Sequence, residues 1–314
     1  MRVPPRCLIS SLVLQVFGDG DIFGERSGKE PPWLLALHGW GRSHLDFTGV
    51  LQPSRASSKL SVAAHDQAGQ NPSQLAGDQG SEIACIRAAL VPADLAGSLP
   101  GQLGGEIDAI ALDLPGFGAT PPPAYAWGSD EYADALVGVV ETMAAPVVVV
   151  GHSFGGRVAL RLAVRHPELV AALVLTGVPL WQSSELRPRP AAAFRVARAL
   201  HRWGLASDAQ IERARQRYGS ADYKAASGVM RDVLVKVLAE SYKADLELIS
   251  CPMELVWGDQ DSVVPLQLAL KAAELIKASG RAPAPVVTCC KGVGHLLPLE
   301  APLELRSAID RHRP

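Results

Sequence analysis

The sequence predicts an α/β protein built on a doubly wound, mostly parallel β-sheet of about eight strands. Short runs rich in Val, Ile and Leu alternate along the chain with segments of helical periodicity, which is the pattern of repeated βαβ units. The runs are almost continuously apolar, as burial on both faces of a parallel sheet requires. The chain has 314 residues, of which 48% are hydrophobic and 20% are charged, so it has enough apolar side chains for a large core.

Six apolar runs are the strand candidates of this sheet, in chain order Trp33–Leu37, Ile107–Leu112, Pro146–Val150, Val170–Leu175, Met253–Trp257 and Val286–Cys289. Amphipathic segments between them predict the helices Ser129–Met143, Gly155–His166 and Leu266–Ala278. The N-terminal stretch Cys7–Phe17 precedes a turn at Gly18–Gly20 and is interpreted as a first strand. Arg2 and Arg6 precede this stretch in the manner of a secretory signal, and the sequence leaves that alternative open.

Two stretches interrupt the alternation of strands and helices. Residues 53–105 are rich in Ser, Ala, Gly and Gln and show little periodicity, so we expect a flexible insert, with a lid over the site as the alternative. Residues 179–250 lack a good strand and contain the helical patterns Pro190–Trp203, Asp208–Tyr218 and Gly228–Lys243. The chain is therefore predicted to comprise a first part of the α/β core at 1–178, a helical unit at 179–250 and a second part of the core at 251–314.

The charge and the cysteine content bear on partners and location. A formal net charge of −2 provides no basic field for a phosphate backbone, so we expect no nucleic-acid partner. Five scattered cysteines, none in a C-x-x-C pair, are expected to be reduced thiols of a cytoplasmic protein. No run reaches the roughly 18 apolar residues of a membrane span, so no stable membrane insertion is expected. The sequence leaves the oligomeric state open.

The most informative motif is GHSFGG at 151–156, where a predicted buried strand runs directly into a predicted helix. A G-x-S-x-G pattern in this setting places Ser153 on a tight strand-to-helix turn and exposes its hydroxyl above the edge of the sheet. Gly151 and Gly155 are the small neighbours that allow the turn to close. Ser153 is therefore the candidate nucleophile.

A serine nucleophile requires a base, and His295 is the candidate. It ends the sequence KGVGH at 291–295, in a glycine-flanked loop directly after the last predicted strand. The base in turn requires a carboxylate that orients it and stabilises its charged form. Asp259 and Asp261 both follow the predicted strand Met253–Trp257, and both are candidates for this acid.

Two backbone N–H groups are candidates for an oxyanion hole, which an acyl-transfer site needs. The sequence HGWG at 38–41 follows the strand Trp33–Leu37, and we expect the Trp40 N–H of this turn to face the same point as the Phe154 N–H after the serine. The stretch Gly24–Lys29 is one residue short of a P-loop, and no dinucleotide fingerprint or metal-ligand spacing is found. We therefore expect no cofactor and no metal.

Together these motifs resemble those of the α/β-hydrolase superfamily, in its serine-nucleophile, carboxylesterase-like branch. The resemblance rests on the HGW turn at 38–40, the loop DLPGFG at 113–118, the GHSFGG elbow, the acid loop at 258–265 and Gly294–His295. The family has its triad in the chain order Ser, Asp, His. Its pattern places the acid three residues after Gly258, which selects Asp261 and leaves Asp259 as a turn residue that caps its own loop. The resemblance further implies that the helices at 179–250 form a cap over the active site.

The residues and the resemblance predict a serine hydrolase that cleaves an ester or related acyl compound through an acyl-serine intermediate. Ser153 is the expected nucleophile, His295 the general base and acid, and Asp261 the orienting acid. A similar triad also supports a C–C bond hydrolase or a lyase. An alternative from another class is a catalytically silent ligand-binding protein of this fold. The expected partner is a small-molecule acyl substrate, whose identity the sequence does not define.

Overall fold

The computed structural model describes residues 14–18, 21–52, 106–180, 196, 199–218 and 221–314. The predicted insert at 53–105, the first part of Cys7–Phe17 and most of Pro190–Trp203 lie outside these residues. A single eight-stranded sheet runs through the described part of the chain. Its strands are β1 (Gln15–Phe17), β2 (Ile22–Ser27), β3 (Leu34–Leu37), β4 (Ala109–Leu112), β5 (Val147–His152), β6 (Val170–Thr176), β7 (Met253–Gly258) and β8 (Val286–Cys290).

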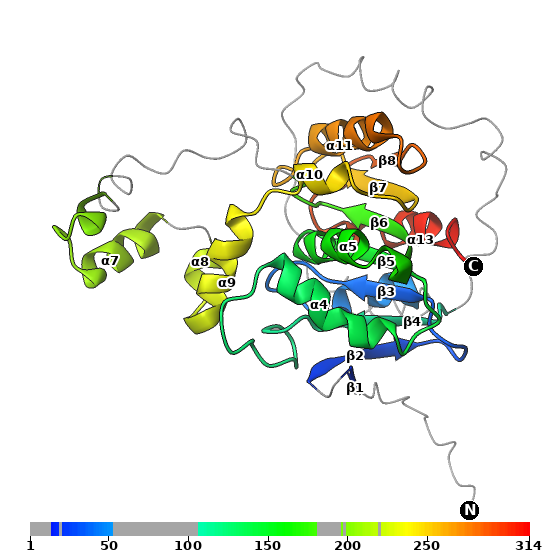
Figure 1. Cartoon of the computed structure of the whole chain (residues 1–314), viewed down its shortest axis with the longest axis horizontal. Helices are drawn as coiled ribbons and strands as arrows, with labels where there is room; N and C mark the ends of the chain where they lie inside the picture. Colours follow the sequence, from blue (N-terminus) through cyan, green and yellow to red (C-terminus); the bar gives the residue numbers. More distant parts are fainter. Residues whose placement is uncertain (1–13, 19–20, 53–105, 181–195, 197–198, 219–220) are drawn as a thin grey trace, which may run out of the picture.

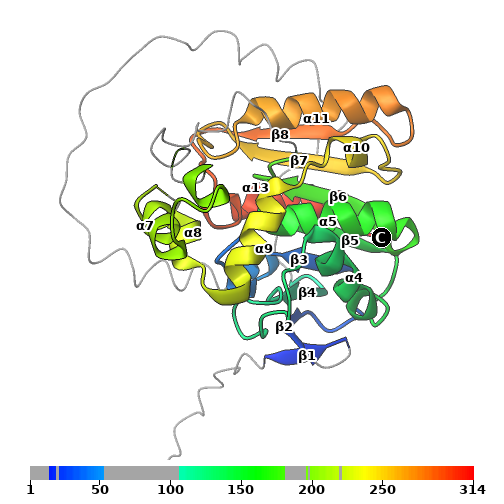
Figure 2. The same cartoon turned by 60° about the vertical axis from the view of Figure 1, so that its left-hand side comes forward.

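The sheet has the strand order β1-β2-β4-β3-β5-β6-β7-β8, which Figure 2 shows from the β1 edge to the β8 edge. The pairs β1/β2 and β2/β4 are antiparallel, and every later pair is parallel. The order reverses at β3, with β4 on one side and β5 on the other, so the sheet is doubly wound. The predicted fold class, a mostly parallel α/β sheet, is confirmed.

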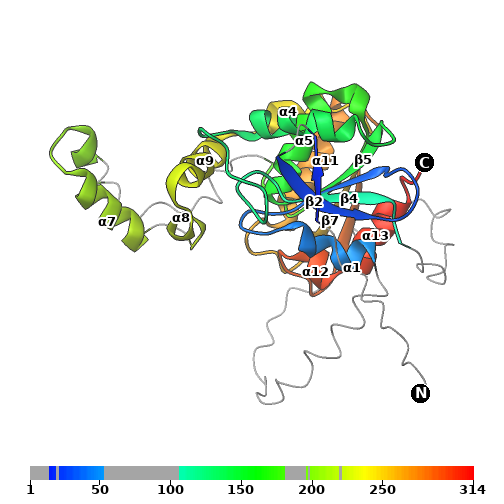
Figure 3. The same cartoon turned by 90° about the horizontal axis from the view of Figure 1, so that it is seen from below.

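Helices cover both faces of the sheet, as Figure 3 shows. One face carries α4 (Ser129–Val140), α5 (Phe154–Arg165) and α11 (Leu266–Ser279), and the other carries α1 (Thr48–Leu51), α12 (Leu297–Glu300) and α13 (Pro302–Asp310). Because side chains alternate along a strand, Leu35 and Leu37 of β3 pack into one apolar layer and Leu34 and Ala36 pack into the other. Burial on both faces explains why β3 and β4 consist of Ala, Ile and Leu alone.

Short helices complete the described part of the chain. Between β6 and β7 lie α7 (Asp208–Tyr218), α8 (Ala221–Ala225), α9 (Gly228–Ala239) and α10 (Lys243–Leu246). The 3-10 helices η1 (His44–Phe47) and η3 (Pro167–Leu169) flank α1 and β6. Figure 1 shows α9 beside the core and α7 farther from it. The predicted helix Gly228–Lys243 is interrupted, because Glu240 is extended, with φ −71° and ψ 152°. Among the described helices, none is both long and apolar enough to cross a membrane.

The sequence analysis missed the strand β2. Its sequence IFGERS alternates between buried and partly exposed side chains, because β2 lies near the antiparallel edge of the sheet and has only one face in the core. Gly24 permits the close packing, since a Cβ atom there would lie 2.5 Å from the Ala111 carbonyl oxygen. A continuous apolar run is therefore typical of the parallel strands of this sheet and is absent from β2.

Candidate active site

The loops that follow the parallel strands lie along one edge of the sheet, because parallel strands end on the same side. The HGWG turn follows β3, Ser153 follows β5, the loop with Asp259 and Asp261 follows β7, and the loop with His295 follows β8. Segments that are far apart in the sequence therefore meet at this edge.

The backbone at Ser153 is strained in the manner expected of a tight strand-to-helix turn. Its φ of 48° and ψ of −106° make it the one non-glycine residue with positive φ among the described residues. A Cβ atom at Gly151 would lie 2.5 Å from the Gly156 Cα, and one at Gly155 would lie 2.2 Å from the Leu37 carbonyl oxygen. The two predicted elbow glycines are thus positions where no larger residue fits.

A continuous series of hydrogen bonds connects the three predicted side chains. His295 Nδ1 lies 2.8 Å from Asp261 Oδ2, and His295 Nε2 lies 3.3 Å from Ser153 Oγ. An ionised carboxylate accepts hydrogen bonds and donates none, so Nδ1 carries the imidazole hydrogen. The unprotonated Nε2 therefore faces the serine hydroxyl and is able to accept its proton.

The structure distinguishes the two candidate acids. Asp261 is buried, and its Oδ1 accepts hydrogen bonds from the Val263 and Val264 N–H groups at 2.9 and 2.8 Å, which leaves Oδ2 for His295. Asp259 instead accepts a hydrogen bond from the Gly292 N–H at 2.7 Å. The expectation that Asp259 caps its own loop was wrong, because its carboxylate joins its loop to the histidine loop.

The HGWG turn lies directly against the elbow. The Gly155 N–H donates a hydrogen bond to the His38 carbonyl at 3.0 Å, and buried His38 in turn accepts one from the Leu114 N–H at its Nε2. Burial lowers the pKa of His38, which favours the neutral ring that this acceptor role requires. Within the described part of the chain, the Trp40 and Phe154 N–H groups have no hydrogen-bond acceptor, so both are available to a ligand.

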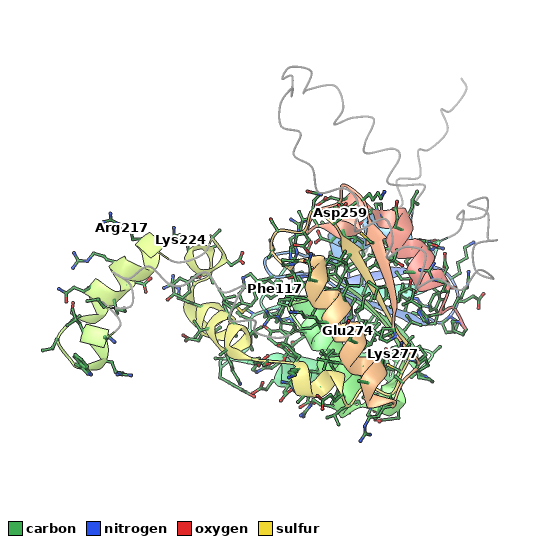
Figure 4. The ribbon with its side chains drawn as sticks, turned by 90° about the horizontal axis from the view of Figure 1, so that it is seen from above. Phe117, Arg217, Lys224, Asp259, Glu274 and Lys277 are labelled. Carbon is green, nitrogen blue, oxygen red and sulfur yellow. The ribbon has the colours of Figure 1, made fainter. Side chains whose placement is uncertain are left out.

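Aromatic side chains form a wall beside the turn and the elbow. The Trp40 ring lies edge-on to those of Phe117 and Phe154, with centroid distances of 4.9 and 5.4 Å. Figure 4 labels Phe117 on the side of the core that faces α9, drawn in yellow. The α9 residue Met230 packs on Gly116, where a Cβ atom would lie 2.2 Å from the Met230 sulfur. A group bound beside Ser153 on this side would meet apolar surface.

The sequence analysis missed Gly177, directly after β6. A Cβ atom at Gly177 would lie 2.9 Å from His295 Cε1, and its φ of +60° is one that glycine adopts without strain. A glycine at the end of a parallel strand was the available signal, but only the fold places it under the histidine ring. Among the described residues, no group of three or more His, Cys, Asp or Glu side chains is arranged to hold a metal ion.

Comparison with protein families identifies the class of protein. The model of a family described as the alpha/beta hydrolase family matches residues 88–308, which is more than half of the chain. This chain therefore belongs to the alpha/beta hydrolase family.

Comparison with curated proteins finds relatives over parts of the chain. It is 49% identical over 71 residues to Lipase LipV of Mycobacterium tuberculosis, covering 22% of this chain and 27% of that protein. It is 47% identical over 70 residues to a 2-hydroxymuconate semialdehyde hydrolase of a Pseudomonas strain, covering 22% of this chain and 25% of that protein. It is 26% identical over 186 residues to a 2-hydroxy-6-oxononadienedioate/2-hydroxy-6-oxononatrienedioate hydrolase of Pseudomonas, covering 52% of this chain and 63% of that protein. The chain thus spans between a quarter and just under two-thirds of these relatives.

Solved structures share the fold over nearly the whole chain. A serine hydrolase involved in carbazole degradation (CarC enzyme) has a TM-score of 0.57 at 19% identity, with 96% of this chain and 98% of that chain covered. A mutant of a meta-cleavage product hydrolase (CumD) has a TM-score of 0.54 at 19% identity, with 95% and 96% covered. At this identity the similarity establishes the fold.

Proposed function

We propose that this chain is a serine hydrolase that cleaves an ester or related acyl compound through an acyl-serine intermediate. Ser153 is the nucleophile, His295 the general base and acid, and Asp261 the orienting acid. One observation carries the proposal, namely the series of hydrogen bonds that runs from Asp261 Oδ2 through both His295 ring nitrogens to Ser153 Oγ. The available N–H groups of Trp40 and Phe154 support their role as oxyanion donors.

The first half of the reaction forms the acyl-enzyme. Ser153 Oγ attacks the substrate carbonyl carbon while its proton moves to His295 Nε2, and the carbonyl oxygen becomes an oxyanion. The Trp40 and Phe154 N–H groups stabilise this oxyanion by two hydrogen bonds. As the tetrahedral intermediate collapses, His295 gives the proton to the departing alkoxide, and an alcohol leaves.

The second half regenerates the serine. His295 Nε2 takes a proton from water as the water oxygen attacks the acyl carbon, and it then returns a proton to Ser153 Oγ as the carboxylic acid departs. Throughout both halves, Asp261 holds the imidazole in the orientation that keeps Nε2 toward the serine. The buried Asp261 carboxylate keeps its two backbone hydrogen bonds and needs no movement during turnover.

The aromatic wall and the helices beside it support a view of the substrate. We propose that residues 179–250 form a cap, with Met230 of α9 and the rings of Trp40 and Phe117 facing an apolar part of the substrate. We also propose a cytoplasmic location, which the five scattered cysteines, none in a C-x-x-C pair, support.

A C–C bond hydrolase is a second candidate function, and the relatives favour it. Two of the curated relatives are named as hydrolases of 2-hydroxymuconate semialdehyde and of 2-hydroxy-6-oxononadienedioate or its triene analogue. The relative that is named as a lipase instead supports cleavage of an ester. The same side chains serve either reaction, so the choice depends on the substrate.

Treatment with a fluorophosphonate, read by intact mass, tests for an active nucleophile. We expect one adduct on the native protein, none on Ser153→Ala, and a full adduct on the control Ser250→Ala, which removes an exposed serine between α10 and β7. A panel of p-nitrophenyl esters of rising chain length and a 2-hydroxy-6-oxo-dienoate then separates ester from C–C cleavage. A native protein that forms no adduct and turns over no substrate would overturn the proposal in favour of a silent ligand-binding protein.

A further inference from the structure

We propose that His152 is a positioning residue that holds the His295 loop in register with Ser153 through a hydrogen bond from its imidazole to the His295 backbone carbonyl. The proposal concerns a residue outside the triad and rests on the function proposed above. It assigns a role to the histidine that directly precedes the nucleophile in the chain.

The geometry of His152 carries the proposal. His152 is the last residue of β5 and is 1% exposed, and its Nε2 lies 2.9 Å from the His295 carbonyl oxygen. The His152 and His295 ring centroids lie 5.0 Å apart. The strand that presents the nucleophile therefore also binds the backbone of the base.

The surroundings of His152 select one form of its ring. A carbonyl oxygen only accepts a hydrogen bond, so Nε2 carries the hydrogen. Among the described residues, Nδ1 has no partner, and it faces Gly39, where a Cβ atom would lie 2.8 Å away. Burial, and then the neighbouring His295, lower the pKa of His152 to about 4. A neutral ring with a fixed Nε2–H tautomer follows.

Other contacts already hold the backbone on either side of His295. Glu300 accepts hydrogen bonds from the Gly294 and Leu296 N–H groups at 2.6 and 3.0 Å. Asp261 binds the imidazole, whereas His152 binds the backbone carbonyl of His295 itself. Together these contacts define the position of Nε2 over Ser153. A displacement of about 1 Å at a reacting group costs on the order of 100-fold in rate.

A variant pair separates this role from simple packing. His152→Leu fills a similar volume and lacks the donor, whereas His152→Gln retains an N–H donor at a similar reach. On the best ester of the panel, we expect His152→Leu to lower kcat by roughly 10- to 100-fold with KM within about twofold, and His152→Gln to recover most of that loss. The matched control His166→Gln, on the partly exposed histidine that follows α5, is expected to keep native kinetics.

Three outcomes of the kinetics overturn the inference. A native kcat in His152→Leu would show that the hydrogen bond to the His295 carbonyl does not contribute to the rate. Equal losses of kcat in folded His152→Leu and His152→Gln would show that the volume of the ring matters rather than its N–H donor. A rise in KM alone would assign His152 to substrate binding. If His152→Leu does not fold, His152→Asn, whose shorter amide stops before the carbonyl, takes its place.

A measurement on the native protein is independent of any variant. Nitrogen NMR of the isotope-labelled histidines at neutral pH should find His152 as a neutral ring with hydrogen on Nε2; a charged ring, or hydrogen on Nδ1, would overturn the inference. A native protein that is inert toward fluorophosphonate and esters would overturn the proposed function and this inference together. An active native protein with an insensitive His152→Leu would overturn this inference alone.

Discussion

Replacing Asp261 by asparagine is expected to abolish most activity by reversing the tautomer of His295. Asp261 Oδ1 accepts two backbone hydrogen bonds, from Val263 and Val264, so the asparagine carbonyl will occupy that position. Its NH2 group must then point to His295 Nδ1, where Oδ2 now lies 2.8 Å away. An NH2 group only donates, so the imidazole hydrogen moves to Nε2, which can no longer accept the proton of Ser153. The corresponding change in a protease triad costs about 10,000-fold in kcat.

The matched variant Asp259→Asn keeps a carbonyl acceptor for the Gly292 N–H and should lose less than about tenfold in kcat. Both variants are assayed for ester hydrolysis at equal folded concentration, with circular dichroism and a urea midpoint to confirm that each is folded. The reasoning would be refuted if Asp259→Asn were the inactive variant, or if Asp261→Asn retained more than about a tenth of native kcat.

Two further predictions concern stability. The Glu240 carboxylate accepts hydrogen bonds from the Ser129 N–H at the start of α4 and from the Tyr242 hydroxyl. Glu240→Ala should therefore lower the free energy of unfolding, measured by urea titration, by about 2 kcal/mol, and Glu240→Gln by about half as much. The hydrogen bond to Asp113 raises the pKa of His44 above 6.5, so the stabilisation is complete below that pH and is lost as pH rises through the raised value. His44→Gln should therefore cost about 1 kcal/mol more at about pH 5.5 than at about pH 8.5, and equal losses would contradict the assignment.

The elements that the sequence predicts well are those whose surroundings are uniform. The parallel strands β3 to β7 are almost entirely buried, so their apolar runs identify them without knowledge of their neighbours. β2 has no continuous apolar run, because only one of its faces is buried, so it was not predicted. The C-terminal helix α13 was not predicted either, because its nine residues give only a short helical pattern. Its Leu305 and Ile309 nevertheless pack into the second apolar layer.

In the candidate site, too, the residues with a distinctive local sequence could be predicted, and the contacts between distant segments could not. Ser153, Asp261 and His295 each lie in a loop whose local sequence is distinctive, so they could be selected before the fold was known, and the structure brings their side chains together. The contacts that hold them there join distant segments. His152 bonds to a residue 143 positions away, which no local pattern indicates.

Gly177 provides a test of how closely the fold must fit the base. Its φ of +60° makes alanine there costly by about 1 to 2 kcal/mol, and the new Cβ would lie 2.9 Å from His295 Cε1, so the ring must move by a few tenths of an ångström. The control is Gly280→Ala after α11, where φ is +66° and no atom lies within 4 Å of the Cβ position. Both variants should lose similar stability in urea, but Gly177→Ala alone should lose kcat, by roughly tenfold or more. If the two variants retain equal kcat, the contact between Gly177 and the His295 ring does not position the base.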